Sequence, residues 1–193
     1  DLKFYLMETG IFYRIFAYKL KILTKSFNEI DFKLLSETKD FFHFEEDRKI
    51  LFSNEISNYA SLLAKKKVVR ELIFEQQRKV LINFPLNFHG IILEGRDCGT
   101  VIAPEAEVKI YLYSDLKVRA DRRFRQIKDN DNISFENIYD EIFKRDKRDM
   151  ERTQSPLKKA KDAVIVDNSK LSLEETINIV KKIIFSTLPY LKK

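Results

Sequence analysis

The sequence has few of the residues that form disulfides, hold metals or interrupt regular structure. Cys98 is the single cysteine, which excludes an intramolecular disulfide and a cysteine-based zinc site. The two histidines, His43 and His89, are too few for a histidine-rich metal centre, so we assign no residue as a metal ligand. No apolar run approaches the length of a membrane span, and the N-terminus does not resemble a secretion signal. We therefore expect no membrane partner and a cytoplasmic location.

Glycine and proline are also scarce, with four of each among 193 residues, and no linker or internal repeat separates one part from another. The hydrophobic content of 44% and the charged content of 34% are typical of one globular domain spanning 1–193. The net charge of +6 favours a polyanionic partner. Charge alone leaves open whether that partner is a nucleic acid or a nucleotide.

Apolar periodicity predicts alternating strands and helices, and therefore an α/β fold with a parallel sheet. The expected strands are 2–6, 88–94, 107–113 and 163–167. The expected helices are 11–23, 54–83 in two pieces near 65–67, 115–129, 134–153 and 172–187. The expected N-caps are Ser114 or Asp115, Ser134 and Ser172. The first helix is indicated by Ile11, Ile15, Tyr18 and Ile22, which recur at helical spacing. Residues 32–38 are expected to form a short helix, and 41–44 a hairpin with 50–52.

One segment, Glu94-Gly-Arg-Asp-Cys-Gly-Thr100, places two glycines and several ionisable groups directly after the apolar run 91–93. Ligands bind at this end of the strands in open parallel sheets. Glycine permits close backbone approach, and the planar guanidinium of Arg96 suits phosphate oxygens. Arg96 could also lower the pKa of Cys98. No histidine lies nearby in the sequence to act as a base, so we do not expect a thiol mechanism.

Two later helices carry further charged clusters. In 134–153 the apolar face continues into Arg145, Asp149 and Arg152, so it must either emerge into water or meet an anion. Helix 115–129 carries Arg119, Arg122, Arg123 and Arg125, a bias that suits bidentate recognition of phosphate. Taken alone, that helix could also bind RNA.

Together these segments resemble bacterial cytidylate kinases over essentially the whole chain. The similarity includes Thr9–Arg14, Ala60-Ser61, Val69–Glu71, Gln77-Arg78, Glu94–Ile110, Arg119–Arg123, Lys144–Asp149 with Arg152, Ser155–Leu157 and Asp162-Ala163. The resemblance implies transfer of the ATP γ-phosphoryl group to CMP or dCMP with Mg²⁺, in a monomer without a nucleic-acid partner. It also implies a P-loop nucleoside monophosphate kinase-like three-layer parallel sheet. The monophosphate-binding insert and its helices would span about 24–83, and the lid about 115–160.

The resemblance also implies a role for each matching residue. Thr9, Arg14 and Arg96 would meet the CMP phosphate with Tyr13 nearby, while Ser61 and Arg70 would read the cytosine edge. Asp97 would contact the nucleotide, and Arg145, Asp149 and Arg152 would hold ribose, base or phosphate. On the ATP side, Arg119, Arg122 and Arg123 would face the donor or the transferring group. The catalytic set implied in this way is Arg96, Asp97, Arg122 and Arg123.

The sequence departs from the family in two places. Cys98 stands where an aliphatic residue is usual, and no G-x-x-x-x-G-K phosphate loop is present. We therefore expect a fragment without the first strand and the phosphate loop, inactive or nearly so. The alternatives are a non-catalytic module that binds CMP but not ATP, and an RNA-binding protein that uses the basic helices.

Overall fold

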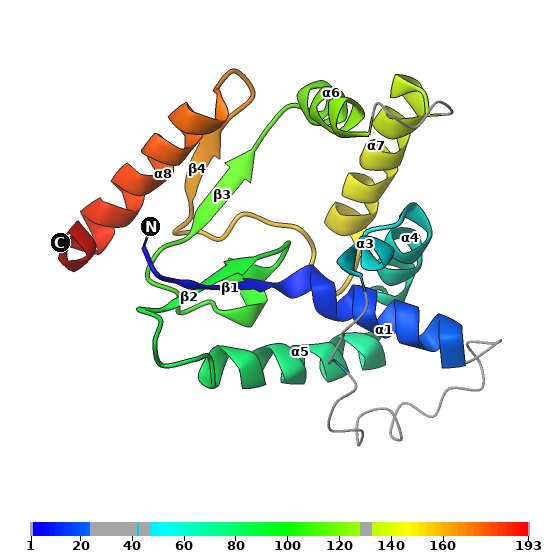
Figure 1. Ribbon diagram of the computed structural model, residues 1–193, viewed down its shortest axis with the longest axis horizontal. Helices are drawn as coiled ribbons and strands as arrows, with labels where there is room; N and C mark the ends of the chain where they lie inside the picture. Colours follow the sequence, from blue (N-terminus) through cyan, green and yellow to red (C-terminus); the bar gives the residue numbers. More distant parts are fainter. Residues whose placement is uncertain (1, 24–41, 43–46, 128–132, 193) are drawn as a thin grey trace. The chain divides into compact units, whose positions relative to one another are not determined.

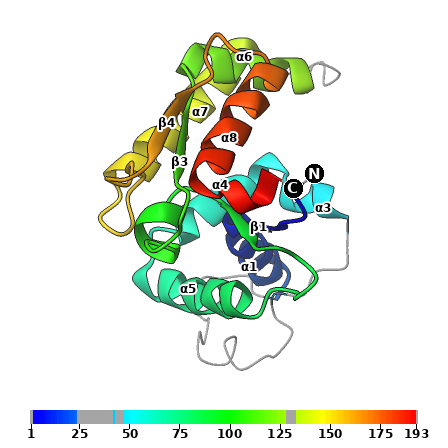
Figure 2. The same cartoon turned by 90° about the vertical axis from the view of Figure 1, so that its left-hand side faces the viewer.

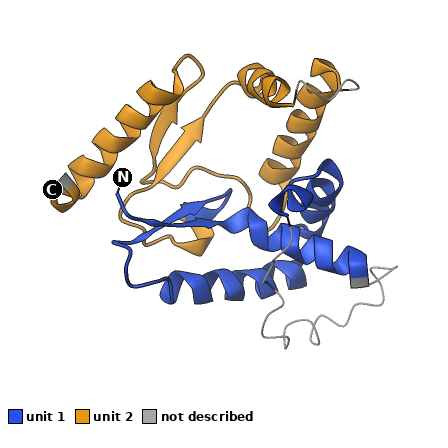
Figure 3. Cartoon of the chain, in the orientation of Figure 1, with its two compact units in different colours: residues 1–98 blue, residues 99–193 orange. Residues whose placement is uncertain are grey.

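The computed structural model describes residues 2–23, 42, 47–127 and 133–192. The chain divides into two compact units, residues 1–98 and residues 99–193 (Figure 3). Within the described ranges, no helix is both long enough and apolar enough to cross a membrane.

The first unit is a parallel strand pair flanked by helices (Figure 1). Strand β1 pairs with β2 so that Tyr5 lies opposite Ile91 and Glu8 opposite Glu94. Parallel strands need a long crossover connection, which helices supply here. The elements in order are β1 (Tyr5–Glu8), α1 (Thr9–Leu23), α3 (Arg48–Leu51), α4 (Asn54–Leu63), α5 (Lys67–Ile82) and β2 (Ile91–Glu94).

The core of this unit lies among α1, α4, α5 and the buried side of β1. Phe12, Phe16 and Leu20 recur every four residues on α1, and all three are buried. The helix itself is confirmed, and of the residues whose spacing indicated it, Ile15 is buried and Ile22 is 62% exposed. Apolar residues surround most of α1, so sequence periodicity could not identify the inward side.

The structure also corrects the expected hairpin. Residues 48–51 form the short helix α3, which Asp47 caps by accepting a hydrogen bond from the Lys49 backbone N–H at 2.9 Å. The proposed second arm, 50–52, is therefore not a strand. The expected helix at 32–38 and most of the first arm, 41–44, lie outside the described residues.

The second unit has its own parallel pair, in which Ile110 of β3 lies opposite Val164 of β4. Helix α8 runs alongside these strands in both views (Figures 1 and 2). After the π-helix η2 (Cys98–Ile102), the elements are β3 (Ile110–Tyr113), α6 (Leu116–Gln126), α7 (Phe135–Glu151), β4 (Val164–Asp167), α8 (Leu173–Thr187) and the 3₁₀ turn η3 (Pro189–Lys192).

The two serine caps in this unit agree with the sequence, whereas Asp115 is the N-cap residue of α6 and makes no side-chain cap hydrogen bond. The Ser134 hydroxyl accepts from Asn137 N at 3.2 Å and begins α7. Ser172 and Glu175 form a complete capping box at the start of α8. The predicted alternation of strands and helices, and the parallel pairing of the strands, are thus confirmed within each unit.

Candidate functional site

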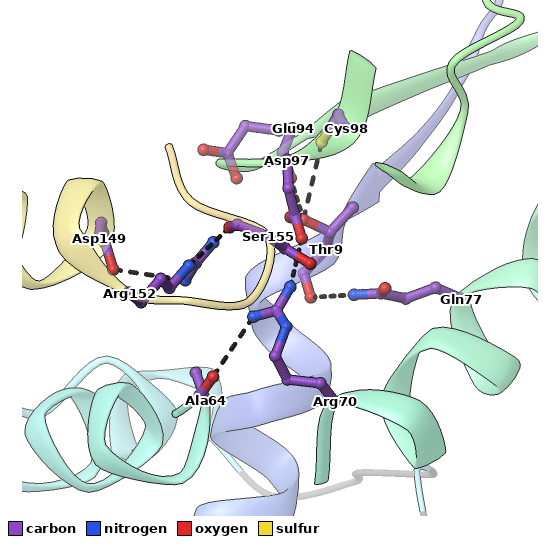
Figure 4. Close-up of polar contacts among 10 residues, drawn as sticks. All are labelled: Thr9, Ala64, Arg70, Gln77, Glu94, Asp97, Cys98, Asp149, Arg152 and Ser155. Carbon is purple, nitrogen blue, oxygen red and sulfur yellow. Dashed lines mark hydrogen bonds and ion pairs between the residues drawn. The ribbon is translucent and has the colours of Figure 1, made fainter. Parts of the chain in front are cut away.

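The first unit places Thr9 at the point where β1 becomes α1, next to the end of β2 (Figure 4). Its hydroxyl donates to the Glu94 carbonyl oxygen at 2.9 Å, and the residue is only 3% exposed. Gly95 makes this approach possible, because a Cβ there would lie 1.9 Å from Thr9 Oγ1. The hydroxyl expected to meet a phosphate is thus engaged in joining the two strand ends.

Arg70 and Asp97 form the buried ion pair of this unit. The Arg70 guanidinium on α5 donates to the Asp97 carboxylate in the bend after β2, and also to the Ala64 carbonyl oxygen at 3.4 Å (Figure 4). Its Cζ lies 5.7 Å from the centre of the Tyr13 ring. Three predicted site residues from α1, α5 and the bend therefore converge, and Arg96 lies partly buried between Gly95 and Asp97.

Two other predicted residues lie toward α3 and α4. Arg14 donates to the Leu51 carbonyl oxygen at 2.7 Å and to Ser57 Oγ at 2.6 Å, with its Cζ 4.6 Å over the Phe52 ring. Ser61 on α4 has a shielded hydroxyl that finds no hydrogen-bond partner among the described residues. Because buried polar atoms are normally paired, this hydroxyl is a candidate ligand contact.

The thiol of Cys98 has the wrong character for a nucleophile. Its sulfur lies 3.8 Å from Thr9 Oγ1, and burial raises the pKa of Cys98 to about 11, a shift that the nearby carboxylates of Asp97 and Glu94 reinforce. The possibility that Arg96 lowers this pKa is not realised. The thiol stays protonated at neutral pH, as expected for a residue without a catalytic role.

The second unit collects its charged residues at the end of α7 and in the loop after it. Asp149 is 7% exposed, and its carboxylate lies 3.5 Å from Arg152 Nη1 and 3.9 Å from Arg145 Nε. Arg152 Nε also donates to the Ser155 carbonyl oxygen at 2.7 Å, where Ser155 has a φ of 46°. The predicted apolar-to-charged face of this helix is confirmed, and its carboxylate is buried between two arginines.

The arginines of α6 differ in the partners that their guanidinium groups contact. Arg119 pairs with Asp146 of α7 at 2.5 Å, and Arg122 donates to the Asn168 side-chain and main-chain oxygens at 3.1 and 2.8 Å. Arg125 pairs with Asp121 at the surface. Arg123 is exposed, and no ion pair or hydrogen bond holds its guanidinium within the described ranges. Arg123 is therefore the member of this group best placed to meet a ligand.

Sequence reasoning gave no role to two buried polar side chains. Gln77 is 2% exposed and donates from Nε2 to the Thr9 carbonyl oxygen at 2.9 Å (Figure 4). The Lys109 ammonium, whose side chain is 9% exposed, donates to Asp162 and to the Pro104 carbonyl oxygen. The signal for Gln77 was present, because an amide at i+4 from Ile73 interrupts the apolar face of α5.

No group of three or more histidine, cysteine, aspartate or glutamate side chains in the described part of the chain could hold a metal ion. Asp97 is the buried carboxylate in the bend after β2, and Arg70 already pairs with it. The first unit thus offers a site built from arginines and hydroxyls. Such a site suits an anionic ligand with a polar ring.

Comparisons with known proteins agree with this chemistry. A family model described as cytidylate kinase matches residues 1–186. A cytidylate kinase of Thermosipho melanesiensis is 40% identical over 190 residues, covering 94% of this chain and 84% of that protein. Those of Chloroherpeton thalassium and Bartonella henselae are 33% and 35% identical, covering 96% and 90% of this chain and 84% and 79% of those proteins. The chain belongs to the cytidylate kinase family.

Proposed function

We propose that this protein transfers the γ-phosphoryl group of ATP to CMP or dCMP, giving CDP or dCDP for pyrimidine nucleotide metabolism. The observation that carries the proposal is the convergence of Thr9, Arg70 and Asp97 in the first unit. Three elements distant in the sequence deliver their polar groups to the shared end of two parallel strands. Ligands of open α/β sheets bind at this end of the strands.

The acceptor phosphate would bind at the N-terminus of α1. The first backbone N–H groups of a helix lack partners within the helix, and the helix dipole favours an anion there. Arg14 and Arg96 would bring their guanidinium groups to the phosphate oxygens, with Tyr13 beside them. The Ser61 hydroxyl, which has no hydrogen-bond partner among the described residues, would contact the cytosine edge together with Arg70, and Asp97 would contact the nucleotide.

The second unit would supply the remaining contacts. Asp149, held between Arg145 and Arg152, would bind the ribose, base or phosphate of the acceptor. Arg123 would neutralise charge on the transferring group, because its guanidinium has no protein partner among the described residues. Arg119 would also face ATP or the transferring phosphoryl group, and residues 115–160 would act as the lid.

Phosphoryl transfer needs positioning and charge neutralisation rather than a covalent nucleophile. A site of arginines with an inert thiol fits that requirement. Mg²⁺ keeps several waters and is bound largely through substrate phosphates, so it would arrive with ATP and neutralise the donor phosphates. Arg96, Asp97, Arg122 and Arg123 would then orient the acceptor and support the developing charge.

The proposal includes the three-layer, P-loop kinase-like sheet, which the parallel pairing in each unit supports. Donor phosphates in that fold rest on a Gly-x-x-x-x-Gly-Lys loop, and the 193 residues contain none. We therefore expect the 193-residue chain to bind CMP while turning over slowly or not at all.

Calorimetry with CMP, dCMP, UMP and ATP, followed by a coupled assay of ADP release, tests the proposal. CMP and dCMP should bind with preference over UMP. The coupled assay should detect little ADP from the 193-residue chain. Binding of CMP with neither ATP binding nor any ADP release would indicate a non-catalytic binding module. Tight, salt-sensitive binding of RNA with no affinity for CMP would contradict both readings.

A further inference from the structure

Gln77 is a buried polar residue on an otherwise apolar face of α5. Val69 and Ile73 precede it at four-residue spacing on the same helix face, and both are fully buried. A buried amide is costly unless it is hydrogen-bonded. Its partner here is the backbone of Thr9, 68 positions away in the sequence, reached at 2.9 Å.

The hydrogen bond from Gln77 is additional to the backbone hydrogen bonds within α1. Thr9 begins the helix, so its carbonyl is placed to accept the N–H four residues later. A carbonyl oxygen has two lone pairs, and the amide of Gln77 uses the second. The bond therefore adds a lateral connection between α1 and α5 rather than satisfying an orphaned group.

Thr9 is consequently held from two directions. Its hydroxyl is bonded to the Glu94 carbonyl at the end of β2, and its own carbonyl receives the amide of α5. Arg70 lies two helical turns before Gln77 on α5 and holds Asp97 in the adjacent bend. The same helix thus fixes both the start of α1 and the segment that carries Arg96.

We infer that Gln77 is a positioning residue for the acceptor phosphate: it holds the first turn of α1 so that the N–H groups of that turn and Arg14 are aligned before the nucleotide binds. This inference rests on the proposed binding of CMP to the first unit. It predicts an effect specific to the phosphate, because the bond acts on the helix start and not on the residues assigned to cytosine.

The test compares Gln77→Met with Gln76→Met, a change at the neighbouring, less buried glutamine of the same helix. Methionine keeps the length of the side chain and removes the donor. In calorimetry, Gln77→Met should weaken CMP binding about fivefold to tenfold, because binding must then order the first turn of α1, at a cost no greater than the lost hydrogen bond. Binding of cytidine, which has no phosphate, should stay the same. Gln76→Met should change neither affinity.

A parallel loss of CMP and cytidine affinity would overturn the inference, because it would indicate a general packing role for Gln77. Unchanged CMP affinity in the variant would also overturn it. If Gln77→Met does not fold, Gln77→Leu is the second apolar variant. Hydrogen exchange at the Tyr13 and Arg14 amides provides a readout without ligand. Faster exchange in the variant would support the inference that Gln77 holds the first turn of α1, and unchanged exchange would refute it. A wild-type chain that binds no CMP contradicts the proposed function, while the exchange data still decide the role of Gln77.

Discussion

The guanidinium of Arg70 donates to the carboxylate of Asp97 inside the first unit, across 27 positions of sequence. The two side chains are only 9% and 10% exposed, so water screens neither charge well. Desolvation of such a pair offsets much of its Coulombic attraction, and the loss of one partner leaves an uncompensated charge. The pair therefore contributes mainly to the position of the bend after β2.

Removing one member of this pair should be more harmful than removing both. Arg70→Met is expected to lower the free energy of unfolding by about 3–5 kcal/mol, because the buried Asp97 carboxylate loses the guanidinium that pairs with it. The double variant Arg70→Met/Asp97→Leu should recover part of that loss. Equilibrium denaturation in urea measures both, and CMP binding should be absent in each. A double variant no more stable than Arg70→Met would contradict this account.

The close approach of Thr9 to Gly95 predicts that a side chain at position 95 destabilises the protein, by an amount that depends on the residue at position 9. A Cβ at position 95 would lie 1.9 Å from Thr9 Oγ1 and 2.9 Å from Cys98 Sγ, so Gly95→Ala should destabilise the protein by about 1–3 kcal/mol. Adding Thr9→Ala removes the nearest atom and should restore part of the stability.

Gly10 is the matched control for this substitution. A Cβ there meets nothing within 4 Å, and the residue is helical. Gly10→Ala should therefore stabilise the protein by about 0.5–1 kcal/mol. Thermal unfolding distinguishes the two glycines, and equal effects from both substitutions would refute the steric argument.

The Cys98 thiol predicts a loss of stability in alkali. Burial raises its pKa from 9.0 to about 11. Between these values the unfolded chain ionises the thiol while the folded chain keeps the proton, so the unfolded state binds fewer protons and stability falls as pH rises. This stabilisation is complete below the unfolded pKa of about 9 and is lost as pH rises through about 11.

Urea denaturation at about pH 8 and about pH 10.5 measures this effect. Cys98→Val should lose less stability than the wild type between the two conditions. Slow labelling of the wild-type thiol at neutral pH is the second expected result. Equal losses in the two proteins would show that other groups cause the alkaline decline.

Arg122 and Arg125 lie on one helix but should differ in importance. Arg122 joins α6 to the Asn168 and Leu171 carbonyl oxygens, at 2.8 and 3.3 Å, whereas Arg125 forms a surface pair with Asp121. Arg122→Ala should cost roughly 1.5–3 kcal/mol, the range for hydrogen bonds to charged groups. Arg125→Ala should change stability by less than about 0.5 kcal/mol. Thermal denaturation of both variants checks this difference.

The sequence predicted the elements better than their contacts. Strong periodicity and serine caps indicated α7 and α8 to within two residues at each end, and the Lys65–Lys67 run marked the break between α4 and α5. The expected strand at 50–52 failed because three apolar residues cannot distinguish a strand from one turn of helix. Short apolar runs therefore needed the tertiary structure to decide their conformation.

The candidate site shows the same division. The resemblance to cytidylate kinases indicated Thr9 and Arg70, and the charged segment after the apolar run 91–93 indicated Asp97. Their actual partners depend on packing between segments 27 to 85 positions apart, which no local pattern encodes. Arg122 illustrates this limit, since its contact with Asn168 spans 46 positions and only the fold could reveal it.

The pairing of β1 with β2 also affects how the protein is made. Tyr5 finds its partner only when Ile91 is available, 86 positions later. At a synthesis rate of about 5–20 residues per second, the ribosome needs about 4–17 seconds to reach that partner after β1 is made. During that interval β1 lacks β2, its partner in the structure, so its unpaired edge is open to binding by a chaperone.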